Sequence, residues 1–142
     1  MPFYKKGKSK IKITTADKWF SKFIRIRDAY DSGFCSCITC GVPRHWKGIQ
    51  CGHYMKRGKP MTRFNEQNCH AQCATCNGQN EGEQGIHSVK IDEMYGYGTA
   101  RKLIDLSKIR GQKLHTKLAL KDIAKEYRLK TKALAIEKGI EL

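Results

Sequence analysis

Four of the seven cysteines form two Cys-x-x-Cys pairs, the spacing that lets two thiolates reach one metal ion from a tight turn. The pairs are Cys37 with Cys40 and Cys73 with Cys76, and 32 residues separate them. Two such knuckles supply the four sulfur ligands that zinc prefers in closed, structural sites. Gly41 follows the first pair and suits a turn whose backbone amides point toward thiolate. We therefore expect a structural zinc ion here, and any chemistry must reside elsewhere.

Three cysteines remain outside the two pairs, namely Cys35, Cys51 and Cys69. Cys35 is an alternative to Cys37 in the first knuckle, although only the spacing of Cys37 fits a standard knuckle. Small buried thiols are the simplest interpretation of the three residues. A sharper alternative is a second zinc site formed by Cys51, His53, Cys69 and His70.

Histidine and asparagine side chains surround the cysteine pairs in an order that suits hydrolysis of a phosphodiester. His53 lies between the pairs, Asn68 precedes Cys73 by five residues, and Asn77 directly follows Cys76. This order is what a ββα-metal nuclease requires. We expect His53 to be the general base that deprotonates a water, and Asn68 to orient its imidazole. Asn77 would offer its side-chain oxygen to a catalytic magnesium or manganese ion.

Each of these residues also has a purely structural interpretation. An amide oxygen is a weak ligand, so the catalytic ion needs a second one, for which His70 and Glu81 are candidates. His70 is equally well explained as a buried tie beside the knuckle, and Asn77 as the cap of the following helix. His53 and Asn68 would then only hold a hairpin together by hydrogen bonds.

Positive charge dominates the chain and is concentrated towards its two ends. The formal net charge is +15, with nine basic and three acidic residues in 1–34 and twelve and five in 101–142. Such a one-sign excess favours a polyanionic partner, which points to nucleic acid. Four basic residues between the cysteine pairs are candidates for contacts with DNA phosphates: Lys56, Arg57, Lys59 and Arg63.

The pattern around these residues predicts an α+β fold with a small zinc-bound centre. Residues 1–13 are expected to be a flexible basic tail, and 14–142 one domain. Apolar residues at helical spacing predict an amphipathic helix from Thr14 to about Ser32–Gly33, with Tyr30 on its face. Residues 35–82 have too little apolar periodicity to fold without a cross-link such as a metal ion. The interval between the two knuckles leaves room for a β-hairpin. Helices are expected at 88–95, 99–109 and 114–137.

In order and spacing, these residues resemble the lambdoid-phage NinG (Rap) recombination proteins over about residues 15–105. The matching segments are 17–28, Cys37–Gly41, Gly52–Tyr54, Arg57–Gly58, Arg63–Glu66, Asn68–Cys73, Cys76–Asn77 and Tyr95–Gly96. The resemblance implies a treble-clef, HNH-like endonuclease that cuts branched DNA, including Holliday junctions and D-loops, during phage recombination. It also implies a homodimer, since symmetric cutting needs two active sites, and other phage recombination proteins as partners.

The arrangement is also similar to that of the phage recombination endonuclease VII, in which an Asn after the last zinc cysteine binds magnesium. There an Asp precedes the general-base His, whereas this chain has Gly52. This departure keeps open a non-catalytic, zinc-dependent DNA-binding accessory protein. An HNH-type enzyme that nicks ordinary duplex DNA is a further alternative. No stretch has the apolar length of a membrane span or a signal peptide, so we expect a protein of the bacterial host cytoplasm.

Overall fold

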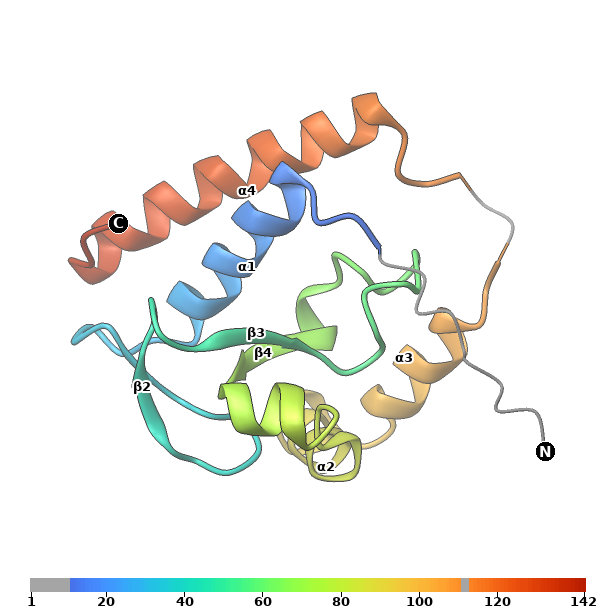
Figure 1. Ribbon diagram of the computed structural model, residues 1–142, viewed down its shortest axis with the longest axis horizontal. Coiled ribbons are helices and arrows are strands. Elements are labelled where there is room, and N and C mark those ends of the chain that lie inside the picture. Colours follow the sequence, from blue (N-terminus) through green and yellow to red (C-terminus); the bar gives the residue numbers. More distant parts are fainter. Residues whose placement is uncertain (1–10, 111–112) are drawn as a thin grey trace.

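The computed structural model describes residues 11–110 and 113–142, which combine helices with two small sheets (Figure 1). The predicted α+β class is therefore confirmed. In chain order the elements are α1 (Thr15–Arg27), β1 (Phe34–Ser36), β2 (Pro43–His45), β3 (Gln50–His53), η1 (Glu66–Asn68), β4 (Cys69–Gln72), η2 (Thr75–Gln79), α2 (Gln84–Tyr95), α3 (Thr99–Ser107) and α4 (Lys117–Lys138).

Helix α1 begins at a capping box and ends earlier than its apolar pattern predicts. The Thr14 side chain accepts from the backbone amide of Asp17, and the Asp17 carboxylate accepts from that of Thr14. The helix ends at Arg27, since its C-cap Asp28 accepts a 2.7 Å hydrogen bond from the backbone amide of Ala71 and Ala29 forms a β-bridge with Cys35. The prediction that the helix reaches Ser32–Gly33 is therefore wrong, and Tyr30 is exposed.

Both sheets are two-stranded antiparallel ribbons. Strands β1 and β2 flank the first cysteine knuckle, with Cys35 paired to Arg44. Strands β3 and β4 form the predicted pairing between the knuckles, in a register that sets Cys51 against Ala71 and His53 against Cys69. Because side chains alternate along a strand, all four of these β3 and β4 residues share one face of the ribbon.

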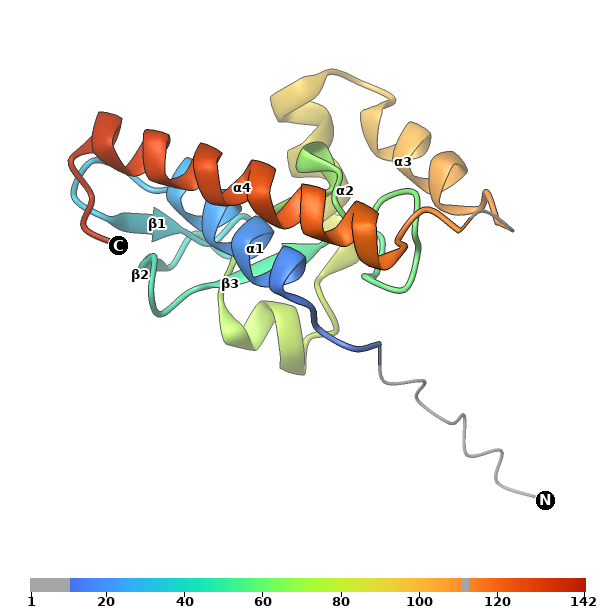
Figure 2. The same ribbon diagram turned by 90° about the horizontal axis from the view of Figure 1, so that it is seen from above.

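Helices cover both faces of the β3–β4 ribbon. Helix α1 packs on one face, where Phe20 and Ile24 contact Cys51 and Cys69, and α4 lies along α1 with Tyr127 in the same core (Figures 1 and 2). On the opposite face, α2 packs against β4 through its buried histidine His87. The ribbon is thus held between two helical layers, and within the described residues no strand pairs with the outer edge of β3.

The three helices of the C-terminal part form close to their predicted positions. Helix α2 begins four residues earlier than predicted, α3 ends two residues earlier, and α4 is shifted towards the C-terminus by one to three residues. Thr116 caps α4 by accepting from the amide of Ala119, and Gly139 ends it in the left-handed conformation that glycine allows. In 11–110 and 113–142, no helix is both long and apolar enough to cross a membrane.

Most of the predicted flexible tail, residues 1–10, lies outside the described residues. Residues 11–13 are described and extend along the domain. The Lys12 carbonyl accepts a 3.3 Å hydrogen bond from Arg63, and the Ile11 side chain covers Gly58 so closely that a Cβ there would lie 2.6 Å from it. These three residues therefore belong to the folded domain.

Candidate functional site

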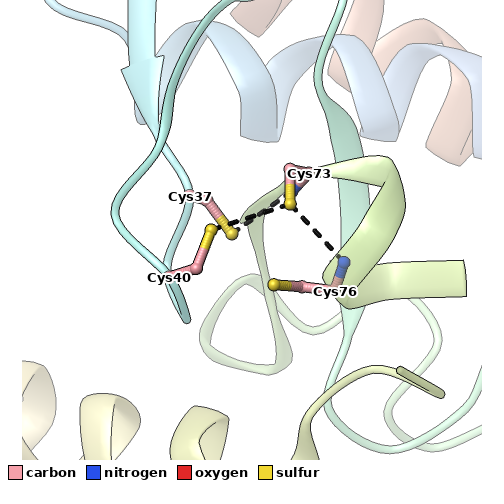
Figure 3. Close-up of side chains that lie close together, drawn as sticks. All are labelled: Cys37, Cys40, Cys73 and Cys76. Carbon is pink, nitrogen blue, oxygen red and sulfur yellow. Dashed lines mark hydrogen bonds between the residues drawn. The ribbon is translucent and has the colours of Figure 1, made fainter. Parts of the chain in front are cut away.

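The two cysteine pairs converge into one cluster, as their spacing predicts (Figure 3). The sulfurs of Cys37, Cys40, Cys73 and Cys76 all lie within 4.8 Å of one another, and the Cys40–Cys73 separation is 3.8 Å. A tetrahedral zinc ion with bonds of about 2.3 Å would set its sulfur ligands about 3.8 Å apart. The cluster therefore fits a structural metal ion such as zinc.

Backbone amides point at two sulfurs of the cluster, and at Cys37 they favour the thiolate form. The Cys73 amide donates to Cys37 Sγ over 3.3 Å, and the Cys76 amide donates to Cys73 Sγ over 3.5 Å. Burial raises the pKa of Cys37, but hydrogen bonds from the backbone amides of Cys40 and Cys73 outweigh it and lower the pKa to about 6. Thiolates are the form that binds zinc. Cys35 lies in a separate core cluster with Ile26 and Trp46.

A cavity of about 410 Å³ opens beside β3 and brings together residues that are far apart in the sequence. It joins His53 and Asn77, the predicted base and metal ligand, with Glu81, the alternative second ligand. Lys56 and Arg57 add positive charge to its wall. The remaining lining residues are Cys51, Gly82 and Gln84.

His53 is held in a defined orientation at the end of β3. Its Nε2 lies 3.1 Å from the backbone oxygen of Arg63, and since a carbonyl only accepts, Nε2 must carry the proton. The lone pair of the ring is therefore on Nδ1. Burial, and next the positive charge of Arg57, lower the pKa of His53 to about 4. The imidazole is neutral at pH 7, which is the form a general base requires.

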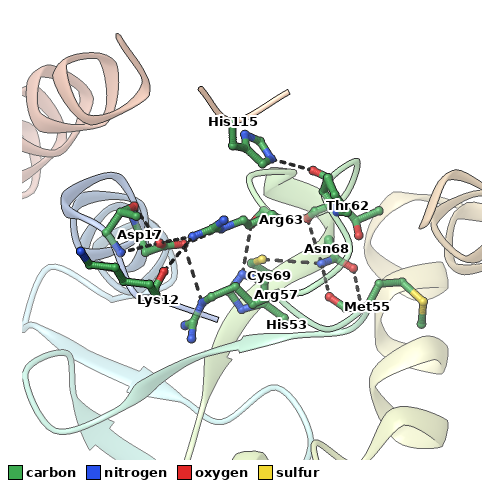
Figure 4. Close-up of polar contacts among 12 residues, drawn as sticks. Lys12, Asp17, His53, Met55, Arg57, Thr62, Arg63, Asn68, Cys69 and His115 are labelled. Carbon is green, nitrogen blue, oxygen red and sulfur yellow. Dashed lines mark hydrogen bonds and ion pairs between the residues drawn. The ribbon is translucent and has the colours of Figure 1, made fainter. Parts of the chain in front are cut away.

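Asn68 ties together the long segment that joins β3 to β4 (Figure 4). Its Oδ1 accepts from the Met55 amide over 2.8 Å, and its Nδ2 donates to the carbonyls of Met55 at 2.9 Å and Thr62 at 3.1 Å. The side chain is fully buried. Asn68 thus acts on His53 through this segment, whose Arg63 carbonyl fixes the imidazole.

Asn77 and Glu81 approach the cavity from the second knuckle. Asn77 lies on η2, and its Nδ2 donates over 2.8 Å to the side-chain oxygen of Gln50 on β3. That bond leaves the Asn77 carbonyl oxygen, the atom able to bind a hard cation, outside the contact with Gln50. Glu81 follows in the left-handed conformation, with φ of 54°, and is exposed at the cavity.

Gly52 has no room for a side chain, because Gln72 crosses the ribbon at this point. A Cβ on Gly52 would lie 2.1 Å from Gln72 Oε1 and 2.8 Å from Gln72 Cβ. Gln72 is fully buried, and its Nε2 donates over 2.8 Å to the carbonyl of Gly82 on the wall of the cavity. An acid at position 52 is therefore incompatible with this packing, and Gln72 instead anchors the loop that carries Glu81.

His70 points away from the cavity and uses both ring nitrogens within the protein. Its Nδ1 lies 3.0 Å from Nε2 of His87, and its Nε2 lies 2.9 Å from the Tyr95 hydroxyl. Burial lowers the pKa of both His70 and His87 to about 3. This geometry favours the interpretation of His70 as a buried tie between β4 and α2.

The four predicted DNA-contacting residues occupy different environments. Lys56 is exposed, Arg57 is partly exposed, and both line the cavity. Lys59 is partly buried in a separate hollow beside Arg110. The Arg63 guanidinium is buried against Asp17, with contacts of 2.6 and 3.0 Å (Figure 4). Arg63 is therefore occupied within the protein, whereas Lys56 and Arg57 line the cavity, Arg57 with its Nε 3.7 Å from Asp17 Oδ1.

Asp17 and Gln72 support the site although their sequence pattern does not mark them as functional. Asp17 anchors Arg63, and its Oδ1 also lies 3.7 Å from Arg57 Nε. Burial raises the pKa of Asp17, but hydrogen bonds from Arg63 and Thr14 outweigh it and leave the pKa below its ordinary value. Both residues lie in segments that resemble the family, 17–28 and Asn68–Cys73, but their spacing does not mark them as site residues.

Fold and site thus define an α+β protein with a cysteine cluster that fits a structural metal ion and a polar cavity beside it. The model of the family described as "Bacteriophage Lambda NinG protein" matches residues 4–137, and the chain belongs to this family.

Two curated relatives, both named "Protein ninG", come from Escherichia phage lambda and Salmonella phage P22. Each is 33% identical over 87 residues, which cover 59% of this chain and 39% of the relative. The match thus spans about two fifths of the length of these relatives. No solved structure matches the chain.

Proposed function

We propose that this protein is a metal-dependent endonuclease that hydrolyses phosphodiester bonds in branched DNA. The observation that carries the proposal is the cavity in which His53, Asn77 and Glu81 meet beneath Lys56 and Arg57. A neutral histidine, oxygen donors for a hard cation and cationic side chains are the groups that phosphodiester hydrolysis needs. The order of knuckle, ribbon and second knuckle agrees with an HNH-like treble clef, which forms part of the same proposal.

In this proposal His53 is the general base. Its lone pair on Nδ1 removes a proton from the water that attacks phosphorus, while Nε2 keeps its own proton and donates it in the hydrogen bond to the Arg63 carbonyl. Asn68 keeps that carbonyl in place through its hydrogen bonds to the Met55–Thr62 segment. Asp17 does so by holding the guanidinium of Arg63. Arg57 and Lys56 bind the scissile phosphate and oppose the negative charge that develops on it.

The second metal ligand is Glu81 rather than His70. Magnesium and manganese prefer oxygen donors, and a carboxylate beside the Asn77 amide oxygen provides the charge that an amide alone lacks. A divalent ion held by these two residues would neutralise the charge on the departing 3′ oxygen. Gln72 makes this possible by holding Gly82, the residue after Glu81, against the ribbon.

Branched DNA is the substrate that agrees best with the family and the charge distribution. The net charge of +15 suits contacts with many phosphates, and contacts of this type read shape and position rather than base sequence. A four-way junction has four backbones and no fixed sequence, so such a surface is adequate for it. The C-terminal helix adds exposed basic residues to this surface, among them Lys121 and Arg128.

A homodimer would place two such cavities on one junction. Helix α4 has an exposed apolar stripe consisting of Leu118, Leu129 and Ile136, which are 70%, 55% and 82% exposed. Their spacings of 11 and 18 residues correspond to about three and five helical turns, so the three side chains share one face. This face points away from α1, and we propose that it pairs with its copy in a second chain.

The substrate proposal is tested by a cleavage assay on a synthetic four-way junction and on linear duplexes with the sequences of its arms. We expect cleavage of the junction with magnesium or manganese, and little cleavage of the duplexes. Equal cleavage of both would favour an HNH-type nicking enzyme with the same site. Junction binding without cleavage under any divalent ion would favour the non-catalytic accessory protein.

A further inference from the structure

A second cluster of metal-binding side chains lies beneath the cavity. The ligand atoms of Cys51, His53 and Cys69 all lie within 4.8 Å of one another. The register of the ribbon accounts for this cluster, because His53 pairs directly with Cys69 and Cys51 lies two residues along on the same face. In residues 11–110 and 113–142, the four-cysteine cluster is the one other group of this kind.

The surroundings of these three residues suit a zinc ion. Cys69 is fully buried and Cys51 is 8% exposed. Cys51 and His53 line the cavity, which gives an ion and a water ligand access to the cluster. Asn68 Nδ2 lies 3.8 Å from Cys69 Sγ and can donate to a thiolate. Two thiolates and a neutral imidazole balance the charge of a divalent ion, so no net charge is buried. Thiolate and imidazole ligands select zinc over magnesium.

A disulfide is a poorer explanation of the two thiols. Cys51 pairs with Ala71 and Cys69 with His53, so the two cysteines are diagonal neighbours on the ribbon. Diagonal neighbours have Cα atoms about 7–8 Å apart, beyond the usual span of a disulfide. A metal ion bridges this distance, because each sulfur need only approach the ion.

We infer that Cys51, His53 and Cys69 form a second zinc site, with three protein ligands and an open position towards the cavity. Because Nε2 of His53 carries a proton, the ion binds at Nδ1, the nitrogen that holds the lone pair. This consequence rests on the proposed function: zinc at Nδ1 blocks the lone pair that His53 uses as general base, so the zinc-bound form is inactive. The site itself depends only on the ligand geometry and not on that function.

The test is the zinc content of the purified full chain after dialysis against a small excess of zinc, measured by mass spectrometry of the metal. We expect two zinc ions per chain in the wild type and one in His53→Ala and in Cys69→Ala. Cys35→Ala should retain two, since Cys35 is an equally buried thiol outside both clusters. Unchanged far-ultraviolet circular dichroism identifies the variants that have folded.

One zinc ion in the wild type, or two in His53→Ala, would overturn the inference. His53 is partly exposed, so its replacement is decisive even if Cys69→Ala fails to fold. Cobalt substitution gives a second readout, because a site with two sulfur ligands has weaker sulfur-to-cobalt absorption than a four-sulfur site. A wild type that binds two zinc ions but cuts no DNA would retain this site and reject the proposed nuclease.

Discussion

At the scale of single residues, the candidate site depends on a few hydrogen bonds and close packing contacts around β3. His53 has its tautomer fixed by one carbonyl, and Gly52 must lack a side chain because Gln72 occupies the space beside it. Gln72 in turn holds Gly82, and so places Glu81 at the cavity. A carboxylate four residues after Asn77 therefore lines the cavity, where an acid at position 52 does not fit.

Glu81→Gln should weaken binding of the catalytic ion without disturbing the fold. The exposed carboxylate makes no ion pair in the described part of the chain, so its loss removes charge from the proposed metal site alone. We expect the magnesium concentration for half-maximal junction cleavage to rise by about tenfold or more. Glu83→Gln is the matched control, since Glu83 also has a positive φ but does not line the cavity. Equal effects of both variants would contradict the assignment.

Gly52→Ala should destabilise the protein by about 1–3 kcal/mol, the usual cost of a methyl group forced into a packed interior. The clash is with the Gln72 side chain, whose Oε1 and Cδ lie 2.1 and 3.0 Å from the new Cβ. The penalty should therefore be smaller in a Gln72→Ala background, as measured by urea unfolding of the four proteins in a double-mutant cycle. A penalty of the same size in both backgrounds would mean that Gln72 is not the obstacle.

At the scale of elements, α1 supports both the core and the site. Its capping residue Asp17 is also the partner of Arg63, so the start of the helix is connected to the carbonyl that binds His53 (Figure 4). The sequence predicted the helix start at Thr14, but the ion pair joins residues 46 positions apart and leaves no local pattern. The helix end was predicted wrongly for a similar reason, because Asp28 bonds to β4.

Asp17→Asn should reduce the free energy of unfolding by about 3–5 kcal/mol, because it leaves the buried Arg63 charge without a partner. The side chains of Asp17 and Arg63 are only 4% and 11% exposed. Asp105→Asn removes an exposed ion pair with Arg101 and should cost less than about 0.5 kcal/mol. Chemical denaturation of both variants makes the comparison. Similar losses in the two would show that Asp17 contributes no more than a surface charge.

At the scale of the whole molecule, two helical layers enclose a ribbon whose open edge carries the cavity. The cysteine spacing predicted the metal cluster, and the apolar periodicity predicted α1 and the three C-terminal helices. The sequence order predicted His53 and Asn77 as site residues, and the fold brings them into one cavity. The sequence could not predict that Arg63 faces inward or that His70 turns towards α2, because both orientations depend on contacts between distant elements.

The dimer proposal belongs to this scale and concerns the stripe on α4. Leu129→Glu should convert a dimer to a monomer in size-exclusion light scattering, because a buried unpaired charge is costly at an interface. Val89→Glu on α2 is the matched control, since Val89 and Leu129 are both 55% exposed. A wild type that is monomeric with and without junction DNA would contradict the proposal.

The proposed function depends above all on His53 as the general base of a junction-cutting nuclease. The most direct measurement is the single-turnover rate of four-way junction cleavage with magnesium or manganese, for the wild type and His53→Ala at equal content of the four-cysteine zinc and equal junction binding. We expect cleavage by the wild type and a loss of about 10²–10⁴-fold in the variant. Equal rates in the two proteins, or a wild type that cuts nothing, would contradict it.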